Sequence, residues 1–471
     1  MIKSIPIATI KKKEYEDYIN KEKLPLLRLD STYLLNIKAY NYIIQQLRRN
    51  GTDISSIEEL GRLKKGQERK NGKKTYGIMV KSIAKLTIHP LKLELKYVSG
   101  SSFVKPCDIA IISTGIGSIG RAGIIPQFLV NDLIKEFFDE NLPVAVTQHI
   151  IKLTLERKDV SPYYIVTLLN SFYGRLLIEG IATYGATGQL EVHTSILSKL
   201  KVPIVNIHDK IAEKVEKALE DYEARAWKAY FKAMKIVEEY LKVEDIGLTS
   251  TSTLKIMKNV GRIDAAMHIL LNGIASKLGE ENIYYISEFY DIISGTAPSS
   301  RKYEEPCKGQ KYISTKSVDE SGYIDDENFY CYPGQLKTRN LAKKGSLVIL
   351  KNAHAVEALG KVGVIYPYDS VPVISDLYIL SLKPSIDEDI SFYINALSKT
   401  KLFKQMMQLL AYGLTAHIKA EDLAKIPIPF IEQWKEVAKY MKEFFENKYH
   451  ADVLKRQAIM ELENQILKLL G

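Results

Sequence analysis

The sequence predicts an α+β protein with two pseudo-symmetric domains joined by two long antiparallel helices, which form a coiled-coil-like spacer. Two observations carry this prediction. The stretch from Tyr184 to Ile204 returns, four residues shorter, from Tyr412 to Ile428, and each copy runs directly into a long charged amphipathic segment. An internal repeat of this size indicates a duplicated module, and 471 residues exceed what one ordinary hydrophobic core supports. Two copies of one module suggest a ligand or partner that comes in two halves.

The repeat divides the chain into four parts. We expect the first domain over residues 1–205, the central spacer helix over 206–242, the second domain over 243–430 and the C-terminal spacer helix over 431–471. Each domain is mixed, because helical periods lie at its ends and short apolar strands with glycine-rich turns lie in its middle.

Each domain begins with the same arrangement of polar and apolar residues. A helical period over residues 36–49 follows Asp30 in the first copy, and a similar period over 269–278 follows Asp264 in the second. A glycine follows both helices, as is common at helix C-termini. Asp30 and Asp264 lie where N-cap residues lie, so we interpret them as caps and not as catalytic carboxylates.

Buried strands are predicted in the middle of each copy. The apolar run after Asp108 corresponds to the run after Ser346, and each copy then continues into an alternating strand that ends near Leu155 or Leu382. Turn residues followed by short apolar runs are typical of such strands. A helical period then resumes in both copies.

A dense basic segment follows the first short apolar element of the first copy. It runs from Gly61 to Tyr76, and its counterpart in the second copy runs from Ser294 to Tyr303. Their glycine and proline residues predict loops, and their basic and hydroxyl side chains suit contacts to phosphates or bases. The alternative is two solvated surface loops. The predicted DNA contacts are Lys64, Lys65, Arg69, Lys70, Lys73, Lys74 and Tyr76 in the first copy, and Ser299, Ser300, Arg301, Lys302, Tyr303 and Lys311 in the second.

Two long amphipathic segments follow the domains. Apolar residues recur every three or four positions over residues 207–241 and 431–470, with Glu and Lys between them. A stripe of this length suits a helix that pairs with another helix, and each helix would extend roughly 50 Å. The alternative is that each helix lies on its own domain. The predicted packing residues of the spacer are Ile211, Val215, Leu219, Trp434, Met441 and Leu462.

The charge balance favours an anionic partner. Lys and Arg number 66 against 56 Asp and Glu, a formal net charge of +10. Such an excess suits nucleic acid, although lysine-rich surfaces also serve solubility or a high growth temperature. Three widely spaced cysteines indicate reduced thiols. Because the sequence has neither a signal peptide at its N-terminus nor an apolar run of membrane-spanning length, we expect a soluble, cytoplasmic protein with no membrane partner.

Motifs for catalysis or cofactor binding are missing from the sequence. Gly115, Gly117 and Gly120 match the spacing of a dinucleotide-binding turn, but a strand that leads to Pro126 follows instead of the required helix. The eight histidines and three cysteines show no metal-ligand spacing, and no nucleophile turn or P-loop occurs. We therefore predict no catalytic, cofactor or metal site, and an enzyme with a fused nuclease or methyltransferase is disfavoured.

Several motifs recur in order along both copies and together cover nearly the whole chain. They are the Arg-x-Asp helix starts at 28–30 and 262–264, the Ser-Gly-Thr-Ala-Pro string at 294–298, the segments 108–120 and 311–324, and the run 423–433 that leads into the last helix. With these motifs the chain resembles the specificity subunit (S, HsdS-type) of type I restriction-modification systems.

The resemblance implies a function. It implies two target-recognition domains that each read one half of a bipartite site on double-stranded DNA, with the paired helices fixing the gap between half-sites. It also implies that each domain docks one methyltransferase subunit, which carries S-adenosylmethionine, and that a restriction subunit is a further partner. The specificity subunit itself is then non-catalytic and holds no cofactor. The first copy departs from the family pattern over residues 203–208 and lacks the Gly-Thr-x-Pro string in its basic segment.

A second class of function fits the same sequence. A non-catalytic scaffold with two modules could bind a dimeric protein, and its basic surface would then be incidental. Salt-dependent binding of duplex DNA separates a DNA reader from such a scaffold, because only the DNA reader releases counterions from phosphates.

Overall fold

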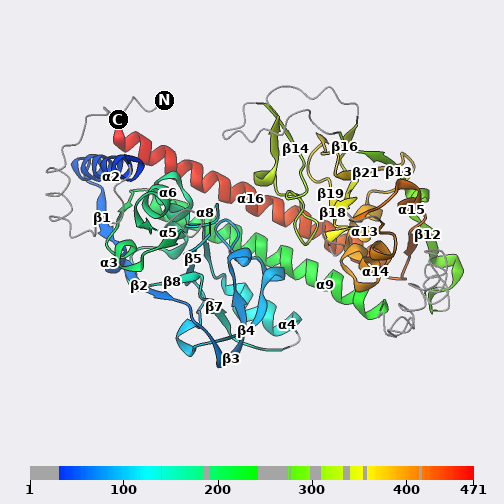
Figure 1. Cartoon of the computed structure of the whole chain (residues 1–471), viewed down its shortest axis with the longest axis horizontal. Helices are drawn as coiled ribbons and strands as arrows, with labels where there is room; N and C mark the ends of the chain where they lie inside the picture. The colour runs from blue at the N-terminus through cyan, green and yellow to red at the C-terminus, as the bar shows by residue number, and fades with distance from the viewer. Residues whose placement is uncertain are drawn as a thin grey trace. The chain divides into compact units, whose positions relative to one another are not determined.

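The computed structural model describes most of the chain, which forms two compact units. The first unit comprises Met1–Ala224 and His450–Gly471, and the second comprises Arg225–Tyr449. Helices account for 47% of the residues and strands for 26%. The strands pair mostly antiparallel, and this mixture fits the α+β class (Figure 1). The described residues are 31–115, 117–138, 140–184, 190–241, 274, 277–296, 309–332, 340–353, 358–412 and 416–471. The expected caps Asp30 and Asp264 lie outside these residues.

A four-stranded antiparallel sheet forms the centre of the first unit. All four residues of its strand β5 are buried, as expected for a short apolar run flanked by other strands on both sides. Two helices, α5 (Pro162–Asn170) and α6 (Phe172–Leu177), add apolar residues to the same core. The strand order is β2–β8–β5–β6, with the bounds Gly61–Lys65, Ile150–Leu155, Ile109–Ile112 and Ala122–Ile124.

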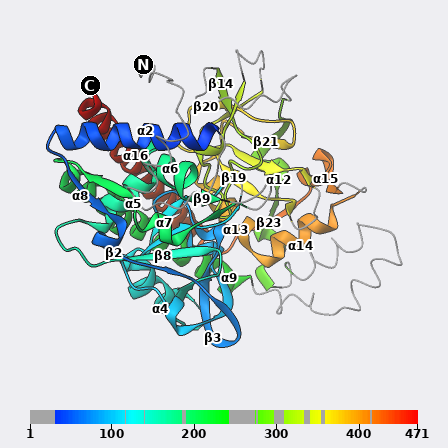
Figure 2. The same ribbon diagram turned by 60° about the vertical axis from the view of Figure 1, so that its left-hand side comes forward.

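Helix α2 begins the described part of the first unit. The helix predicted over residues 36–49 is confirmed, and it spans Ser31–Arg49. It is followed by Gly51, whose φ of 71° is the left-handed conformation that glycine adopts after helices. Its buried face packs on the core near η5 (Ile178–Ala182), and Figure 2 shows α2 lying across α6.

The basic segment between Gly61 and Tyr76 is two strands and not the predicted loop. Strand β2 ends at Lys65, and β3 (Glu68–Ile78) pairs antiparallel with β4 (Glu94–Val98) and parallel with β7 (Val144–Val146). The prediction was wrong because strand formation here depends on partners that are distant in the sequence, and exposed lysines are tolerated on the solvated face of a sheet.

Smaller elements complete the first unit. The two-stranded sheets pair β1 (Asp53–Ser56) with β11 (Lys201–Ile204) and β9 (Thr183–Tyr184) with β10 (Glu191–Val192). The short helices are α3 (Ile57–Leu60), η1 (Val80–Ser82), η2 (Pro90–Lys92), η3 (Gly100–Ser102), η4 (Leu129–Leu133), α4 (Ile134–Phe137) and α7 (Thr194–Leu197).

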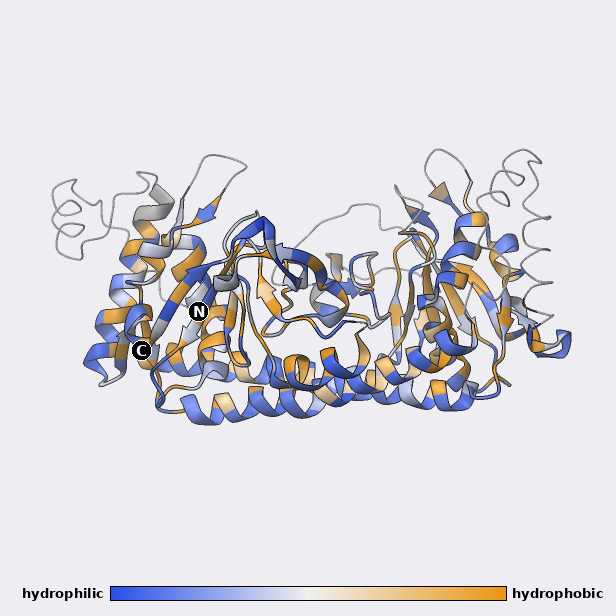
Figure 3. Ribbon diagram, turned by 90° about the horizontal axis from the view of Figure 1, so that it is seen from below, coloured by the Kyte–Doolittle hydropathy of each residue, from blue (hydrophilic) through white to orange (hydrophobic). Residues whose placement is uncertain are grey.

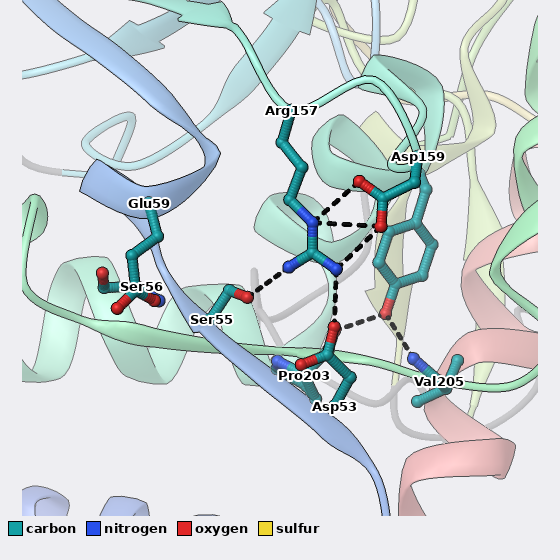
Figure 4. A network of polar contacts seen from close by, with 9 residues as sticks. Asp53, Ser55, Ser56, Glu59, Arg157, Asp159, Pro203 and Val205 are labelled. Atoms are coloured by element: carbon teal, nitrogen blue, oxygen red, sulfur yellow. Dashed lines mark hydrogen bonds and ion pairs between the residues drawn. The ribbon is translucent and has the colours of Figure 1, made fainter.

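Arg157 joins strand β1 to the segment that follows β8 (Figure 4). Its guanidinium donates hydrogen bonds to Asp159 and Asp53 at 2.8 Å each, and to the hydroxyl of Ser55 at 2.5 Å. Hydrogen bonds to Asp159 and then Asp53 raise the pKa of Arg157. Because the carboxylates are well exposed, the network orders this edge of the unit and contributes little free energy.

The second unit contains a sheet with the same order of corresponding strands. If the four strands of each sheet are numbered by their order in the sequence, their order across the sheet is first, fourth, second and third in both units. Helices α13 (Asp389–Lys399) and α14 (Lys401–Leu409) follow the last of these strands, as α5 and α6 do in the first unit. The order is β13–β21–β17–β19, with the bounds Tyr290–Ser294, Leu377–Leu382, Leu347–Leu350 and Val362–Val364.

Short strand pairs and helices complete the second unit. The antiparallel pairs are β12 (Ile283–Tyr285) with β23 (Pro427–Pro429), β14 (Gln310–Tyr312) with β15 (Tyr330–Tyr332), β16 (Leu341–Lys343) with β20 (Ser370–Pro372), and β18 (Asn352–Ala353) with β22 (Ala416–His417). The short helices are η8 (Glu280–Asn282), α12 (Ile286–Phe289), η9 (Asp326–Asn328) and α15 (Ala420–Ala424).

A buried tyrosine makes the same contact in each unit. The hydroxyl of Tyr164 in α5 donates to the carbonyl of Pro203 at 2.6 Å, and that of Tyr393 in α13 donates to the carbonyl of Pro429 at 2.5 Å. Both hydroxyls also accept a backbone N–H from two residues beyond the proline. Each tyrosine thus fixes the chain at the point where the domain leads into a long helix.

A pair of antiparallel helical segments lies within the first unit. The helical run α8 (His208–Glu216) and η6 (Lys217–Glu223) packs against the C-terminal part of α16 (Trp434–Leu470). Lys214 forms an ion pair with Glu461, and Lys455 forms one with Glu223 at 2.8 Å. Residue numbers rise along one helix as they fall along the other, so the two run antiparallel. The predicted packing residues Ile211, Val215, Leu219 and Leu462 share one buried cluster.

A second antiparallel pairing lies within the second unit. Helix α9 (Ala224–Tyr240) meets the N-terminal part of α16, where the rings of Trp227 and Phe444 lie 5.3 Å apart and Gln433 donates to the Tyr240 hydroxyl at 2.6 Å. Met441 is fully buried. Hydrophilic and hydrophobic residues alternate along these helices in Figure 3, as an amphipathic stripe requires. The ring of Trp434 lies against Phe430 and Tyr393.

Candidate nucleic-acid interface

The basic side chains of β2 and β3 lie on the surface of the first unit. Most of the predicted contact residues on these strands are exposed, and Lys74 is half-buried. The pairing of β3 with β4 shifts register between Glu68 and Lys73, so the intervening residues bulge from the ladder. The predicted contacts that are exposed are Lys64, Lys65, Arg69, Lys70 and Lys73.

These cations differ in how far neighbouring groups neutralise them. Lys65 forms an ion pair with Glu191, and Lys74 forms one with Glu140, whose hydrogen bond raises the pKa of Lys74. Lys73 lies 5.5 Å from the centre of the Phe103 ring. Within the described part of the chain, Lys64, Arg69 and Lys70 have no ion-pair partner, so they are the most available cations for an external anion.

Tyr76 lies in the core and not on the surface. It is 8% exposed, and its ring packs edge to face on Phe138 at 4.9 Å. The neighbouring strand β4 instead exposes Leu95 and Tyr97, which are paired in register with Tyr76 and Lys74. Sequence reasoning missed these two residues, because the alternation of residues 94–98 would place the apolar Leu95 and Tyr97 on a buried face.

A hollow of about 450 Å³ opens at the end of the four-stranded sheet of the first unit. The β2–β3 turn, the end of β5, the start of β8 and strand β10 contribute to it. Only Lys65 and Arg69 of its lining were predicted as contacts. The lining residues are Lys65, Gly66, Gln67, Glu68, Arg69, Thr114, Gln148, His149 and Glu191.

A chain of hydrogen bonds orders one wall of this hollow. The hydroxyl of Thr114 lies 3.0 Å from Nδ1 of His149, and the amide nitrogen of Gln148 lies 3.2 Å from Nε2 of the same ring. The backbone N–H of Ser113 donates to the carbonyl of His149 at 2.9 Å, which fixes the ends of β5 and β8 together. Gly66 closes the turn beside them, because a Cβ there would lie 2.3 Å from the carbonyl oxygen of Thr147.

The corresponding sheet end of the second unit carries a different polar cluster. Lys351 donates to the hydroxyl of Ser294 at 2.5 Å and lies 4.6 Å from the centre of the Tyr378 ring. Asn352 donates to Asp376 at 3.4 Å and also contacts Nδ1 of His417. Burial lowers the pKa of Lys351. Burial, and then the charges of Lys351 and Lys419, lower the pKa of His417.

Most of the predicted contacts of the second unit lie outside the part of the chain that the structure describes. Ser299, Ser300, Arg301, Lys302 and Tyr303 lie outside the described residues. Lys311 is exposed on β14, where it pairs in register with Cys331 of β15.

The cysteines do not all have the predicted state. Cys331 is disulfide-bonded, so the expectation of three reduced thiols is wrong for this residue. Cys107 is a free, half-buried thiol, and burial raises its pKa.

The glycine-rich turn after β5 leads into a strand. No helix begins there, because the described residues lead from Gly120 directly into β6. Gly117 and Gly120 have φ values of 78° and 81°, which the tight turn requires. Among the residues that the structure describes, no three His, Cys, Asp or Glu side chains are placed to hold a metal ion together.

Within the described ranges, no single helix has both the length and the apolar composition of a membrane span, and one bent pair, Pro162–Asn170 with Phe172–Ala182, meets these two criteria only when taken together.

Solved structures of subunits from type I restriction-modification systems are similar to this chain. The S subunit from M. genitalium is 15% identical with a TM-score of 0.35, over 89% of this chain and 96% of that chain. The HsdS subunit from Thermoanaerobacter tengcongensis is 12% identical with a TM-score of 0.26, over 89% and 95%. A chain from a type I R-M system studied for complex assembly and conformational transition is 12% identical with a TM-score of 0.27, over 89% and 97%. No family model and no curated protein matches the chain.

Proposed function

We propose that this chain is the non-catalytic specificity subunit of a type I restriction-modification complex. Each unit reads one half of a bipartite site on double-stranded DNA and docks one methyltransferase subunit, and a restriction subunit is a further partner. The observation that carries the proposal is the repetition of one sheet order in two units whose corresponding sheet ends carry different polar side chains. One frame with two different surfaces suits two different half-sites joined in one ligand.

Affinity for DNA would come mainly from the cations of β2 and β3. Phosphate contacts position a protein on duplex DNA but carry no sequence information, and each releases counterions. Lys64, Arg69 and Lys70 are exposed and have no carboxylate partner within the described residues, so they are the strongest candidates. Lys65 and Lys74 contribute less to the affinity for DNA, because carboxylates already neutralise them.

The long helices would set the distance between the half-sites. Antiparallel contacts occur between the helical segments within each unit, and α16 is one continuous helix from Trp434 to Leu470. In this proposal residues 206–242 and 431–471 act as the spacer between recognition domains 1–205 and 243–430. S-adenosylmethionine would be bound by the methyltransferase subunits in the cytoplasm, and not by this chain.

Two measurements test the function. The first is the mass of the intact complex that copurifies with the tagged chain at mild salt, where we expect two methyltransferase subunits per chain. The second is selection of that complex on random duplexes, where we expect a consensus of two short blocks separated by a fixed gap. Recovery of an unrelated protein dimer without salt-dependent duplex binding would instead establish the scaffold.

The contact residues are tested by the salt dependence of duplex binding. Replacing both Arg69 and Lys70 by Ala should reduce the slope of log K against log salt by about 2, since each lost phosphate contact reduces it by about 1. Lys158→Ala is the matched control, because Lys158 is also an exposed lysine of the first unit but lies outside β2 and β3. An unchanged slope in the double variant would remove these residues from the interface.

A further inference from the structure

The charges around the hollow of the first unit do not suit a phosphate. Two cations, Lys65 and Arg69, are matched by two carboxylates, Glu68 and Glu191, among the lining residues. Lys65 is already paired with Glu191. A phosphate placed here would meet a carboxylate for every cation, so Coulomb repulsion cancels most of the attraction. The hollow therefore favours a neutral polar ligand.

The rest of the lining offers neutral donors and acceptors. Thr114, Gln148, His149 and Gln67 carry hydroxyl, amide and imidazole groups, and no apolar side chain contributes to the lining. Base edges in the major groove present the same kind of neutral donors and acceptors, and amide side chains recognise them in pairs. A hollow of about 450 Å³ is also within the size range of small-ligand sites.

The hydrogen bonds of His149 determine which polar groups of the Gln148 amide remain available to a ligand. The amide nitrogen of Gln148 donates to Nε2 of His149, and in the tautomer that fits this contact Nδ1 donates to the Thr114 hydroxyl. Gln148 is left with one amide N–H and its carbonyl oxygen, and neither has a partner among the described residues. An adjacent donor and acceptor on one amide match N7 and the N6 amino group of adenine.

We propose that this hollow is the base-reading site of the first unit, with Gln148 as the residue that selects adenine at one position of the half-site. Thr114 and His149 are positioning residues, because they orient the Gln148 amide through the ring. This assignment rests on the proposed DNA-binding function and adds that different residues provide sequence selectivity and affinity. The hollow determines sequence, and the unpaired cations Lys64, Arg69 and Lys70, of which Arg69 also lines the hollow, determine affinity.

The test compares Gln148, which is assigned to sequence selectivity, with Lys70, which is assigned to affinity; both side chains are exposed. Duplex selection and salt titration are carried out on the full chain in its complex with Gln148→Ala, Gln148→Glu and Lys70→Ala. Gln148→Ala should lose on the order of tenfold discrimination at one base pair while the salt slope stays unchanged. Gln148→Glu removes the donor, so the preference at that position should move from adenine to cytosine, whose N4 amino group a carboxylate accepts. Lys70→Ala should lower the salt slope by about 1 and leave every base preference unchanged.

The outcomes separate this inference from the function on which it rests. If the unmodified complex binds no duplex, the DNA-binding function itself fails. If it binds but Gln148→Ala keeps the same preference at every position, or loses affinity for all sequences equally, the hollow does not read a base. Thermal unfolding of each variant controls for folding, which an exposed Gln148 should leave unaffected.

Discussion

The two units present different side chains on the same backbone frame. In the first unit the N–H of Ser113 donates to the carbonyl of His149, and in the second the N–H of Lys351 donates to that of Asp376. The side chains at these sheet ends nevertheless differ, because a Thr114–His149 contact in one corresponds to an Asn352–Asp376 contact in the other. Backbone hydrogen bonds therefore maintain the frame, while the side chains at the sheet ends differ and can define a different ligand surface.

The helix pairings of the two units also differ in chemistry. The segment in the first unit contains a buried ion pair between Lys455 and Glu223, whereas the segment in the second is built from rings, including Trp227 and Phe444. A buried ion pair restricts the alignment of two helices because displaced charges lose their partners. Aromatic packing, in contrast, stabilises the helix pair mainly through the large apolar area that it buries.

The largest expected effect is on the aromatic pairing. Trp227→Ala should destabilise the second unit by about 3–5 kcal/mol, because Trp227 is 1% exposed and its removal leaves a cavity beside Phe444. Denaturant unfolding followed by hydrogen exchange in each unit would measure this. Tyr284→Ala is the control, since Tyr284 is 39% exposed. Equal losses in both variants would contradict the packing described for α9.

The ionic pairing should be nearly as sensitive. Lys455→Met removes the ammonium that lies 2.8 Å from Glu223 and leaves that buried carboxylate without this contact, which should cost about 3 kcal/mol. The exposed pair of Arg175 and Glu179 offers the comparison, because Arg175→Met should cost at most about 0.5 kcal/mol. Chemical denaturation of both variants gives the difference, and a similar small cost for both would show that burial does not strengthen the Lys455 contact.

The repeated tyrosine contact should respond equally in both units. Tyr164→Phe and Tyr393→Phe each remove one buried hydroxyl that donates to a proline carbonyl and accepts a backbone N–H. Leaving such groups without a partner costs about 1–3 kcal/mol. Thermal unfolding should therefore show two losses of similar size, and a clear inequality would mean that the two frames are not energetically equivalent.

A pH-dependent effect is expected at a position where the two frames differ. The Asn170 amide donates to the carbonyl of Ala122 at 2.8 Å, and Lys399 donates to that of Val362 at the same distance. Burial lowers the pKa of Lys399 to about 7, although the charge of Asp319 opposes this. Because the folded pKa lies below the unfolded value, the unfolded state binds more protons between about pH 7 and 10, and stability should rise with pH there.

Lys399→Asn tests this by installing the residue of the first unit. The variant should keep the hydrogen bond to Val362 but lose the rise in stability between pH 7 and 10. The measurement is the difference in free energy of unfolding between the two proteins at several pH values, which cancels other titrating groups. A difference independent of pH would show that Lys399 remains charged in the folded protein.

Sequence alone determined the elements whose signal is local. The period of residues 36–49 predicted α2, and the apolar stripes predicted the long helices, because a helix is read from neighbours three and four positions apart. The turn after β5 was likewise excluded as a dinucleotide site because the required helix was missing from the sequence. The contact residues Lys64, Arg69 and Lys70 were predicted from composition, and their exposure is compatible with that prediction.

Only the tertiary structure decided which residues share a surface. Tyr76 and Tyr97 lie on the same face of the sheet, and Tyr76 is buried because Phe138, far along the chain, packs on it, which sequence alternation does not specify. The hollow joins the β2–β3 turn to Thr114, Gln148 and Glu191, and ion pairs neutralise Lys65 and Lys74 through partners far along the chain. These contacts arise from strand pairing between distant segments, so no local pattern of residues could have revealed them.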